Sequence, residues 1–429
     1  MTKQLGRILL VSFFITLLIT GLAGAYDYPF TDPFVATVVG TPSELSEKLP
    51  SKVPVKVDSI QMFPDRKVPG KLWSFSELRY SYTRQSGPAP LIFLIAGTGA
   101  SFNSAKMIGM QKAFYQAGYH VISLTSPTHP NFVVAASTSG VPGDIEEDSA
   151  DLYKVMQKVW QKIGKKIEVT NFYLTGYSLG AANSAFVAKL DEQEKVFNFR
   201  KVLLINPPVS LYNSVLILDA LLEENIPGGL DNFNAFYDRL INAFADVYAH
   251  GEGVEFNNDF LYKAYEYRKP TSDEPLKALI GMSFRLSSMN MAFATDVLTK
   301  ANYVVPKNLI IGRHDNTHVY SKVLSRLTFL DYFHDVLLPY AQSQNPQVTE
   351  PQMIKKLSLR RIEDYIRTSP KFGLIHNEDD IILLPGEIDY LRGVFGERAK
   401  VFPSGGHCGN MNYPDNVAAM IGFFQAFKQ

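Results

Sequence analysis

The fold of this chain is decided by one stretch of sequence, Asn171-Phe172-Tyr173-Leu174-Thr175-Gly176-Tyr177-Ser178-Leu179-Gly180. The apolar residues before the glycines predict a strand, and the alanine-rich run over 181–188 predicts a helix. The G-x-S-x-G pentapeptide between them is typical of a sharp turn. A serine hydroxyl is a poor nucleophile, so it must project from such a turn toward a base, with backbone N–H groups nearby for an oxyanion. The stretch therefore predicts that Ser178 is a nucleophile.

Strands and helices alternate on both sides of this stretch. The continuously apolar run 91–96 predicts a central parallel strand that is buried on both faces. A glycine-containing loop, a helix over 106–115, a strand over 118–124 and a helix over 144–162 follow, and 201–206 predicts the next strand. Two alternating segments, 55–62 and 75–82, precede them and predict an antiparallel pair. This rhythm predicts an α/β fold with a doubly wound, mostly parallel sheet.

The strand pattern is interrupted between residues 209 and 370, where helical periodicities with short loops predominate. It resumes with strands over 372–376 and 399–402, a helix between them, and a last helix over 415–427. We therefore predict a sheet domain made of residues 53–208 and 371–429, with a mainly helical cap domain, residues 209–370, inserted into it.

The N-terminus predicts export. Lys3 and Arg7 precede an apolar run, and Ala23-Gly24-Ala25 fits a cleavage site, so residues 1–25 are predicted to be a signal peptide. An uncleaved anchor is the alternative. We expect a periplasmic or secreted protein, with no stable membrane span after cleavage, and the lack of a glycosylation sequon favours a bacterial setting. Residues 26–52 are predicted to be an arm or linker, with no assigned function.

Composition limits the function further. The chain has 429 residues, 46% of them hydrophobic and 12% aromatic, which is typical of a large globular protein. The 42 basic and 42 acidic residues give zero net charge, so a nucleic-acid partner is not expected. Cys408 is the single cysteine, which excludes an intrachain disulfide and favours a buried apolar role.

A catalytic serine needs a base, and that base needs a carboxylate to orient it. His407 and Asp380 are the candidates, because each follows a late strand at the sheet edge where Ser178 also emerges. They are 27 residues apart, with one helix and one strand between them. Asp379 competes with Asp380 for the role of the acid and is otherwise expected to be a solvated turn residue. Residues 206–209, after the preceding strand, contain no carboxylate.

With its Gly176–Gly180 pentapeptide, the turn at 377–380 and Gly405-Gly406-His407, the sequence resembles the α/β-hydrolase superfamily over about 53–208 and 372–429. The resemblance implies a serine hydrolase with Ser178 as nucleophile, His407 as base and Asp380, at the family's usual spacing, as acid. It also implies an oxyanion hole from the backbone N–H groups of Leu179 and Thr98. Where many relatives have His-Gly in the second loop, this chain has Ala96-Gly97. No cofactor or metal is implied.

Three other residues or pairs could carry chemistry. His129 could line the pocket, His314 and His318 could form a metal site, and Cys408 could provide thiol chemistry, but a structural role is favoured for each. Cys408 is expected to point away from His407, because adjacent residues on a strand or loop point apart. We expect hydrolysis of a carboxylic ester or thioester, on a small-molecule or lipid-like acyl substrate. The alternatives are an acyltransferase of the same fold and a binding protein that retains the scaffold without catalysis.

Overall fold

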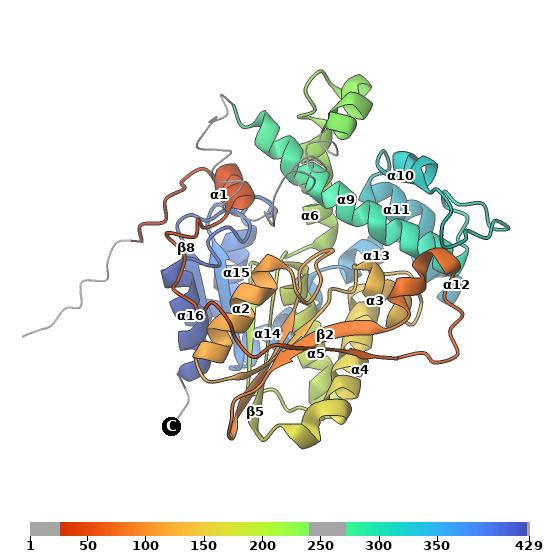
Figure 1. Ribbon diagram of the computed structural model, residues 1–429. Coiled ribbons are helices and arrows are strands. Elements are labelled where there is room, and N and C mark those ends of the chain that lie inside the picture. Colours follow the sequence, from red (N-terminus) through yellow and green to blue (C-terminus); the bar gives the residue numbers. More distant parts are fainter. Residues whose placement is uncertain (1–25, 240–271, 427–429) are drawn as a thin grey trace, which may run out of the picture.

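The computed structural model describes residues 26–239 and 272–426 (Figure 1). The predicted signal peptide, residues 1–25, and residues 240–271 of the predicted cap lie outside the described residues. Within the described ranges, one sheet of eight strands runs through the molecule in the order β1-β2-β4-β3-β5-β6-β7-β8. The strands are β1 Lys56–Ile60, β2 Leu78–Thr83, β3 Ala89–Ile95, β4 His120–Leu124, β5 Val169–Tyr177, β6 Lys201–Ile205, β7 Phe372–Asn377 and β8 Ala399–Phe402.

Strand β2 is antiparallel to both of its neighbours, β1 and β4, and every other pair in the sheet is parallel. The central strands β4 and β6 are buried at every position, because helices cover both faces of the sheet. This double burial explains their continuously apolar sequences. The predicted doubly wound, mostly parallel sheet is confirmed.

Helices pack on both faces of the sheet (Figure 1). One face is covered by α2 Ala105–Gln116 and α16 Pro414–Gln425, and the other by α4 Ile145–Ile163, α5 Leu179–Glu194 and α15 Glu387–Phe395. A separate hydrophobic core lies under each layer. Short helices α3 Pro130–Ala135, η1 Gly70–Phe75, η2 Gly164–Lys166 and η6 Gly396–Arg398 complete the connections.

The described residues between β6 and β7 contain helices and one isolated β-bridge, Ser210 to Ser358. These helices are α6 Leu211–Glu223, η3 Leu230–Asn232, α9 Glu274–Thr299, α10 His318–Leu324, α11 Phe329–Tyr332, η4 Phe333–Leu337, α12 Leu338–Gln344, α13 Glu350–Lys356, η5 Leu359–Ile362 and α14 Glu363–Thr368. The expectation of only short loops here is wrong, because residues 300–317 have no helix or strand. The Asp296 carboxylate holds this connection by accepting hydrogen bonds from the backbone N–H groups of Tyr303, Val304 and Val305.

The predicted arm contains a helix, α1 Pro33–Val39, that the sequence analysis did not anticipate. Asp32 caps it by accepting hydrogen bonds from Phe34 and Val35, both at 2.8 Å, and proline occupies its first position. Its buried residues pack against α9. The helix is therefore part of the folded body.

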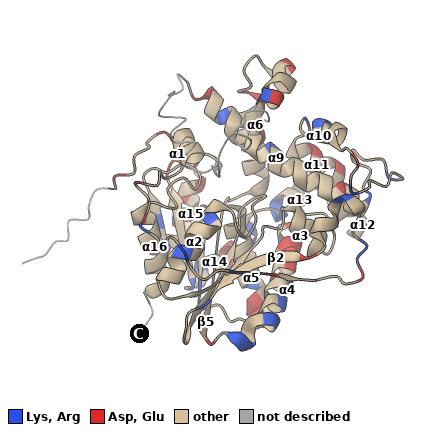
Figure 2. Ribbon diagram, in the orientation of Figure 1, with Lys and Arg blue, Asp and Glu red and all other residues tan. Residues whose placement is uncertain are grey.

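None of the helices in the described ranges is both long enough and apolar enough to cross a membrane. Acidic and basic residues are interspersed over the described elements (Figure 2), in keeping with the zero net charge of the whole sequence.

A buried ion pair joins α6 to α9. Arg285 is only 1% exposed, and its guanidinium donates to Asp219 at 2.9 and 3.2 Å and to Glu223 at 3.3 Å. It also donates to the Ser325 carbonyl oxygen. Because the guanidinium is removed from water, these acceptors are needed to offset the free-energy cost of burying its charge.

We predict that Asp219→Ala lowers the free energy of unfolding by about 3 kcal/mol or more, because it leaves the buried Arg285 guanidinium without its main counter-charge. Urea denaturation measures the change. Asp389→Ala is the control, since its ion pair with Arg392 is exposed and is worth at most about 1 kcal/mol. Equal losses in the two variants would contradict a special role for the buried pair.

Candidate active site

Ser178 lies on a strained turn between β5 and α5. Its backbone has φ 54° and ψ −127°, a conformation that costs a non-glycine residue roughly 1–3 kcal/mol. The surrounding backbone holds it there, because Ser178 N–H donates to the Ile205 carbonyl at 2.9 Å and its own carbonyl accepts from Ala181. A Cβ on Gly176 would lie 2.3 Å from the Gly180 carbonyl oxygen, and one on Gly180 would lie 2.2 Å from that of Ile95. Glycine is therefore required on both sides of the serine.

His407 and Asp380 meet Ser178 at this edge of the sheet. The Nε2 atom of His407, in the loop after β8, lies 2.9 Å from Ser178 Oγ. Its Nδ1 atom lies 3.0 Å from both carboxylate oxygens of Asp380, which follows β7. The structure thus brings together the three residues that were predicted from sequence, in the order serine, imidazole, carboxylate.

Asp379 does not contact His407 in this arrangement and has a different place. Its carboxylate accepts hydrogen bonds from the backbone N–H groups of Gly405 and Gly406, at 3.1 and 2.9 Å. The interpretation of Asp379 as a solvated turn residue is wrong, because the carboxylate is partly buried and braces the loop that carries His407. A second brace comes from α1, since Thr37 Oγ1 accepts the backbone N–H of His407 at 2.9 Å.

Asp380 is fully enclosed by polar groups that sequence reasoning did not single out. Asn206 Nδ2 donates to its Oδ2 atom at 2.9 Å, and the Ile382 N–H donates to Oδ1 at 3.2 Å. A buried second imidazole, His376, lies 3.6 Å from Oδ2. Asn206 directly follows β6, at the position where the sequence analysis considered only a carboxylate. An amide donor at this position was a signal that the sequence contained.

The charges of the pair oppose the effect of burial. Burial alone would raise the pKa of Asp380, but the neighbouring His407 holds that pKa below its usual value. Burial likewise acts to lower the pKa of His407, but the Asp380 carboxylate and the neighbouring Cys408 together raise that pKa above its usual value. Burial lowers the pKa of His376, which keeps this second ring neutral. The arrangement therefore favours an ionised Asp380 and makes His407 a stronger base.

The two predicted oxyanion donors also belong to this site. Thr98 lines the same cavity as Ser178, and Leu179 is the first residue of α5. Among the described residues, no acceptor is found for the backbone N–H of either one. The Thr98 loop is fixed by a hydrogen bond from Gly99 N–H to Thr128 Oγ1 at 2.8 Å. Both N–H groups are therefore free to donate to a bound oxygen.

A cavity of about 330 Å³ opens beside Ser178 and His407. Helices α1, α6 and α9 wall it, so the N-terminal segment and the region between β6 and β7 both reach the site. Its apolar lining consists of Val38, Leu218, Leu279, Ile280 and Phe284. Its polar lining, apart from the residues already described, includes Ser283, Ser287 and Lys106. The cavity therefore offers both apolar and polar side chains to one ligand.

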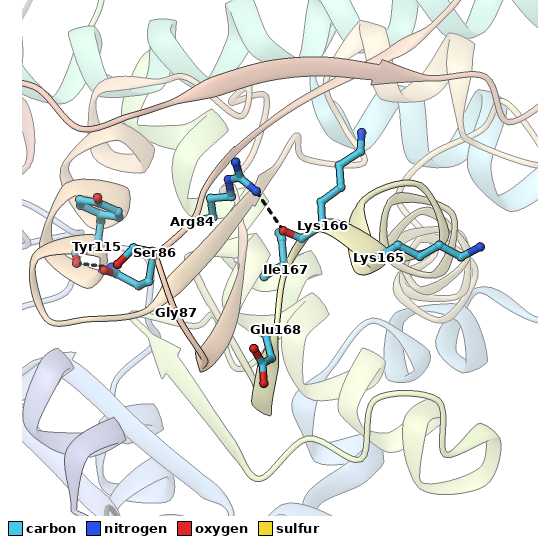
Figure 3. A pocket seen from close by; sticks show the side chains of 9 residues that line it. Arg84, Ser86, Gly87, Tyr115, Lys165, Lys166, Ile167 and Glu168 are labelled. Carbon is cyan, nitrogen blue, oxygen red and sulfur yellow. Dashed lines mark hydrogen bonds between the residues drawn. The ribbon is translucent and has the colours of Figure 1, made fainter.

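A larger hollow of about 680 Å³ lies at the opposite edge of the sheet (Figure 3). Arg84 donates to the backbone carbonyl of Lys166 there, and the side chains of Lys165 and Glu168 point in different directions. No group of side chains converges on one point in this view. The hollow has none of the chemistry found beside Ser178.

The alternative residues have other surroundings. His129 caps α3 by accepting the Asn131 N–H at 3.0 Å, and burial lowers its pKa to about 4. His314 and His318 are exposed, and in the part of the chain that the structure describes no three potential metal ligands gather. Cys408 is buried, but the expectation that it points away from His407 is wrong, because its Sγ atom lies 3.9 Å from Nε2. Its positive φ of 63° turns the side chain toward the ring.

No protein-family model and no curated protein sequence matches the chain. Among solved structures it is similar to a bacterial membrane phospholipase A, with 15% identity, a TM-score of 0.42, and 87% of this chain and 86% of that chain covered. It is also similar to a thermostable carboxyl esterase from Bacillus coagulans, with 11% identity, a TM-score of 0.41, and 87% and 99% covered. A third is the thioesterase domain from the curacin biosynthetic pathway, with 11% identity, a TM-score of 0.37, and 86% and 98% covered.

The sheet itself identifies the fold. Its second strand runs antiparallel, β4 precedes β3 in the strand order, and the fifth strand ends in the turn that carries Ser178. A nucleophile turn between a strand and a helix at the edge of such a sheet is typical of this fold. This chain has the α/β-hydrolase fold.

Proposed function

We propose that this protein is a serine hydrolase that cleaves carboxylic ester or thioester bonds through an acyl-enzyme on Ser178. The observation that carries the proposal is the unbroken hydrogen-bond chain from Ser178 Oγ through His407 to Asp380, with distances of 2.9 and 3.0 Å. Such a chain supplies a nucleophile, a base within reach of its proton, and a carboxylate that fixes the base.

In the proposed reaction, His407 Nε2 takes the proton of Ser178 Oγ as this oxygen attacks the carbonyl carbon. The N–H groups of Thr98 and Leu179 donate to the oxyanion, and each such donor is worth about 3–4 kcal/mol in the transition state. The imidazolium returns the proton to the leaving alcohol or thiol. Water, activated by His407, then releases the acid from Ser178.

Asp380 stays ionised during this cycle and stabilises the imidazolium. Asn206 and the Ile382 N–H satisfy its remaining acceptor sites, which supports a fixed carboxylate. The apolar wall formed by α6 and α9 favours an acyl chain or another apolar group of a lipid-like substrate. We further propose that residues 209–370 act as the cap of the site, and that the leader at residues 1–25 directs export.

We predict that a fluorophosphonate probe labels the purified protein at Ser178 and that labelling is abolished in Ser178→Ala. The reaction requires the activated oxygen, which the variant lacks. Gel fluorescence and peptide mass spectrometry measure the label. A folded wild-type protein that fails to react would favour the binding-protein alternative, and labelling at another residue would remove Ser178 from its role.

Separate replacement of Asp379 and Asp380 tests which of the two carboxylates is the acid that orients His407. We expect Asp380→Asn to lower kcat by about 10⁴-fold, because the amide cannot stabilise the imidazolium or hold its tautomer. Asp379→Asn should lower kcat by only about ten-fold, because one loop hydrogen bond is retained by the amide oxygen. Steady-state kinetics on 4-nitrophenyl esters measure both. The reverse order would make Asp379 the acid.

The pH dependence of kcat/KM gives a further prediction. Neutral His407 is the form that accepts the proton, so kcat/KM rises as pH increases through its pKa. Because the Asp380 carboxylate raises this pKa, Asp380→Asn lowers it and shifts the acidic limb of the residual activity to lower pH. Profiles of wild type and variant over about pH 5 to 9 measure the shift. An unmoved limb would contradict the electrostatic role given to Asp380.

A further inference from the structure

Lys106 borders the same cavity as Ser178. It lies in the first turn of α2 and is half-buried, and the cavity it lines has a volume of about 330 Å³. Among the described residues that line this cavity, it is the one lysine or arginine. Tyr177 also lines the cavity, and burial raises the pKa of its phenol, so that it stays neutral.

No counter-charge is found for Lys106. Among the described residues, no carboxylate lies within ion-pair distance of its ammonium. Some other partly buried lysines are paired, such as Lys356 with Asp144 and Lys371 with Glu192, whereas Lys112 and Lys189 are partly buried and, among the described residues, have no carboxylate within ion-pair distance. What distinguishes Lys106 from the other unpaired lysines of the described residues is that it lines the cavity beside Ser178.

The local backbone also disfavours a cation at this position. The N-terminal end of a helix carries partial positive charge, and a cation there costs about 0.3–1 kcal/mol. Lys106 is the second residue of α2, so it opposes the dipole of its own helix. An anion bound in the cavity would reverse this effect, because it would be attracted by both the ammonium and the helix end.

The position of α2 places Lys106 in the lining of the cavity that Ser178 and His407 also line. The loop that carries Thr98 leads directly into α2. One turn after Lys106, Gly109 approaches the loop that follows His407, since a Cβ there would lie 2.7 Å from Asn412 Oδ1. Helix α2 thus adjoins both the proposed oxyanion loop and the loop that follows the base.

Building on the proposed hydrolase activity, we propose that the substrate carries an anionic group, a carboxylate or a phosphate, and that Lys106 binds it beside the ester. The apolar wall that includes Leu218, Leu279 and Phe284 would take the uncharged part of the same molecule. Lys106 then determines specificity through an ion pair in a partly water-excluded site, where charge-assisted hydrogen bonds are stronger than at the surface.

The test compares two matched pairs of nitrophenyl esters. In the first pair the acyl chain ends in a carboxylate or in the primary amide of the same size, as in 4-nitrophenyl adipate and its amide. In the second pair the carboxylate or the amide lies on the nitrophenyl leaving group. We expect wild type to prefer the anionic member of at least one pair in kcat/KM, and Lys106→Met to reduce that preference by about ten-fold. A phosphate in place of the preferred carboxylate distinguishes the two anions.

Lys112→Met is the matched control, because Lys112 lies on the same helix but lines a different surface hollow. It should keep the wild-type preference, as should Lys106→Arg, which retains the charge. Raising the salt concentration should weaken the preference in wild type more than in Lys106→Met.

Equal preferences in wild type and Lys106→Met for both pairs would overturn the role of Lys106, even with every ester hydrolysed. Failure of a folded wild type to hydrolyse any ester would instead overturn the proposed hydrolase, and with it the substrate inference.

Discussion

The site depends first on the close approach of three strand ends around Ser178. The turn has a positive φ, which the serine adopts only because the Ile205 carbonyl accepts its N–H and because Gly176 and Gly180 leave no room for anything larger. The ends of β3, β5 and β6 are therefore locked together where the hydroxyl emerges. The same contacts set the direction of α5, whose first residue is Leu179. The proposed nucleophile and one of its oxyanion donors thus share a single constraint.

The base is held by a different set of contacts, which come from both ends of the chain. Asp379 accepts two N–H groups of the glycines that precede His407, and Thr37 of α1 accepts the N–H of His407 itself. Gly406 is also packed against α1, since a Cβ there would lie 2.3 Å from the Pro33 carbonyl oxygen. Residues 26–52 therefore help to place the imidazole and form part of the cavity wall, which a free linker would not do.

These contacts explain which features could be predicted from sequence. The sheet and the meeting of Ser178, Asp380 and His407 were predictable, because apolar runs identify buried strands and the carboxyl ends of parallel strands share one edge. The role of Asp379 was not, because the sequence of a turn does not show whether a polar side chain faces water or braces a neighbouring loop, whereas Asn206 had a signal in its position directly after β6. The α1 helix had a local signal in Asp32 and the proline after it, but its seven residues are too short for periodicity to reveal.

In the proposed site, one charged side chain selects the substrate and a different set of residues carries out the reaction. With zero net charge and interspersed surface charges, the molecule has no overall field that would draw an anion from a distance (Figure 2). Exposed charges are screened within about 8–10 Å at ordinary salt, so selection by charge has to occur inside the cavity. Lys106 is the side chain that meets this condition, because it is half-buried, unpaired among the described residues, and next to the proposed oxyanion loop. A cation there attracts a substrate anion at short range, while the hydrogen-bond chain behind Ser178 is left to transfer the proton.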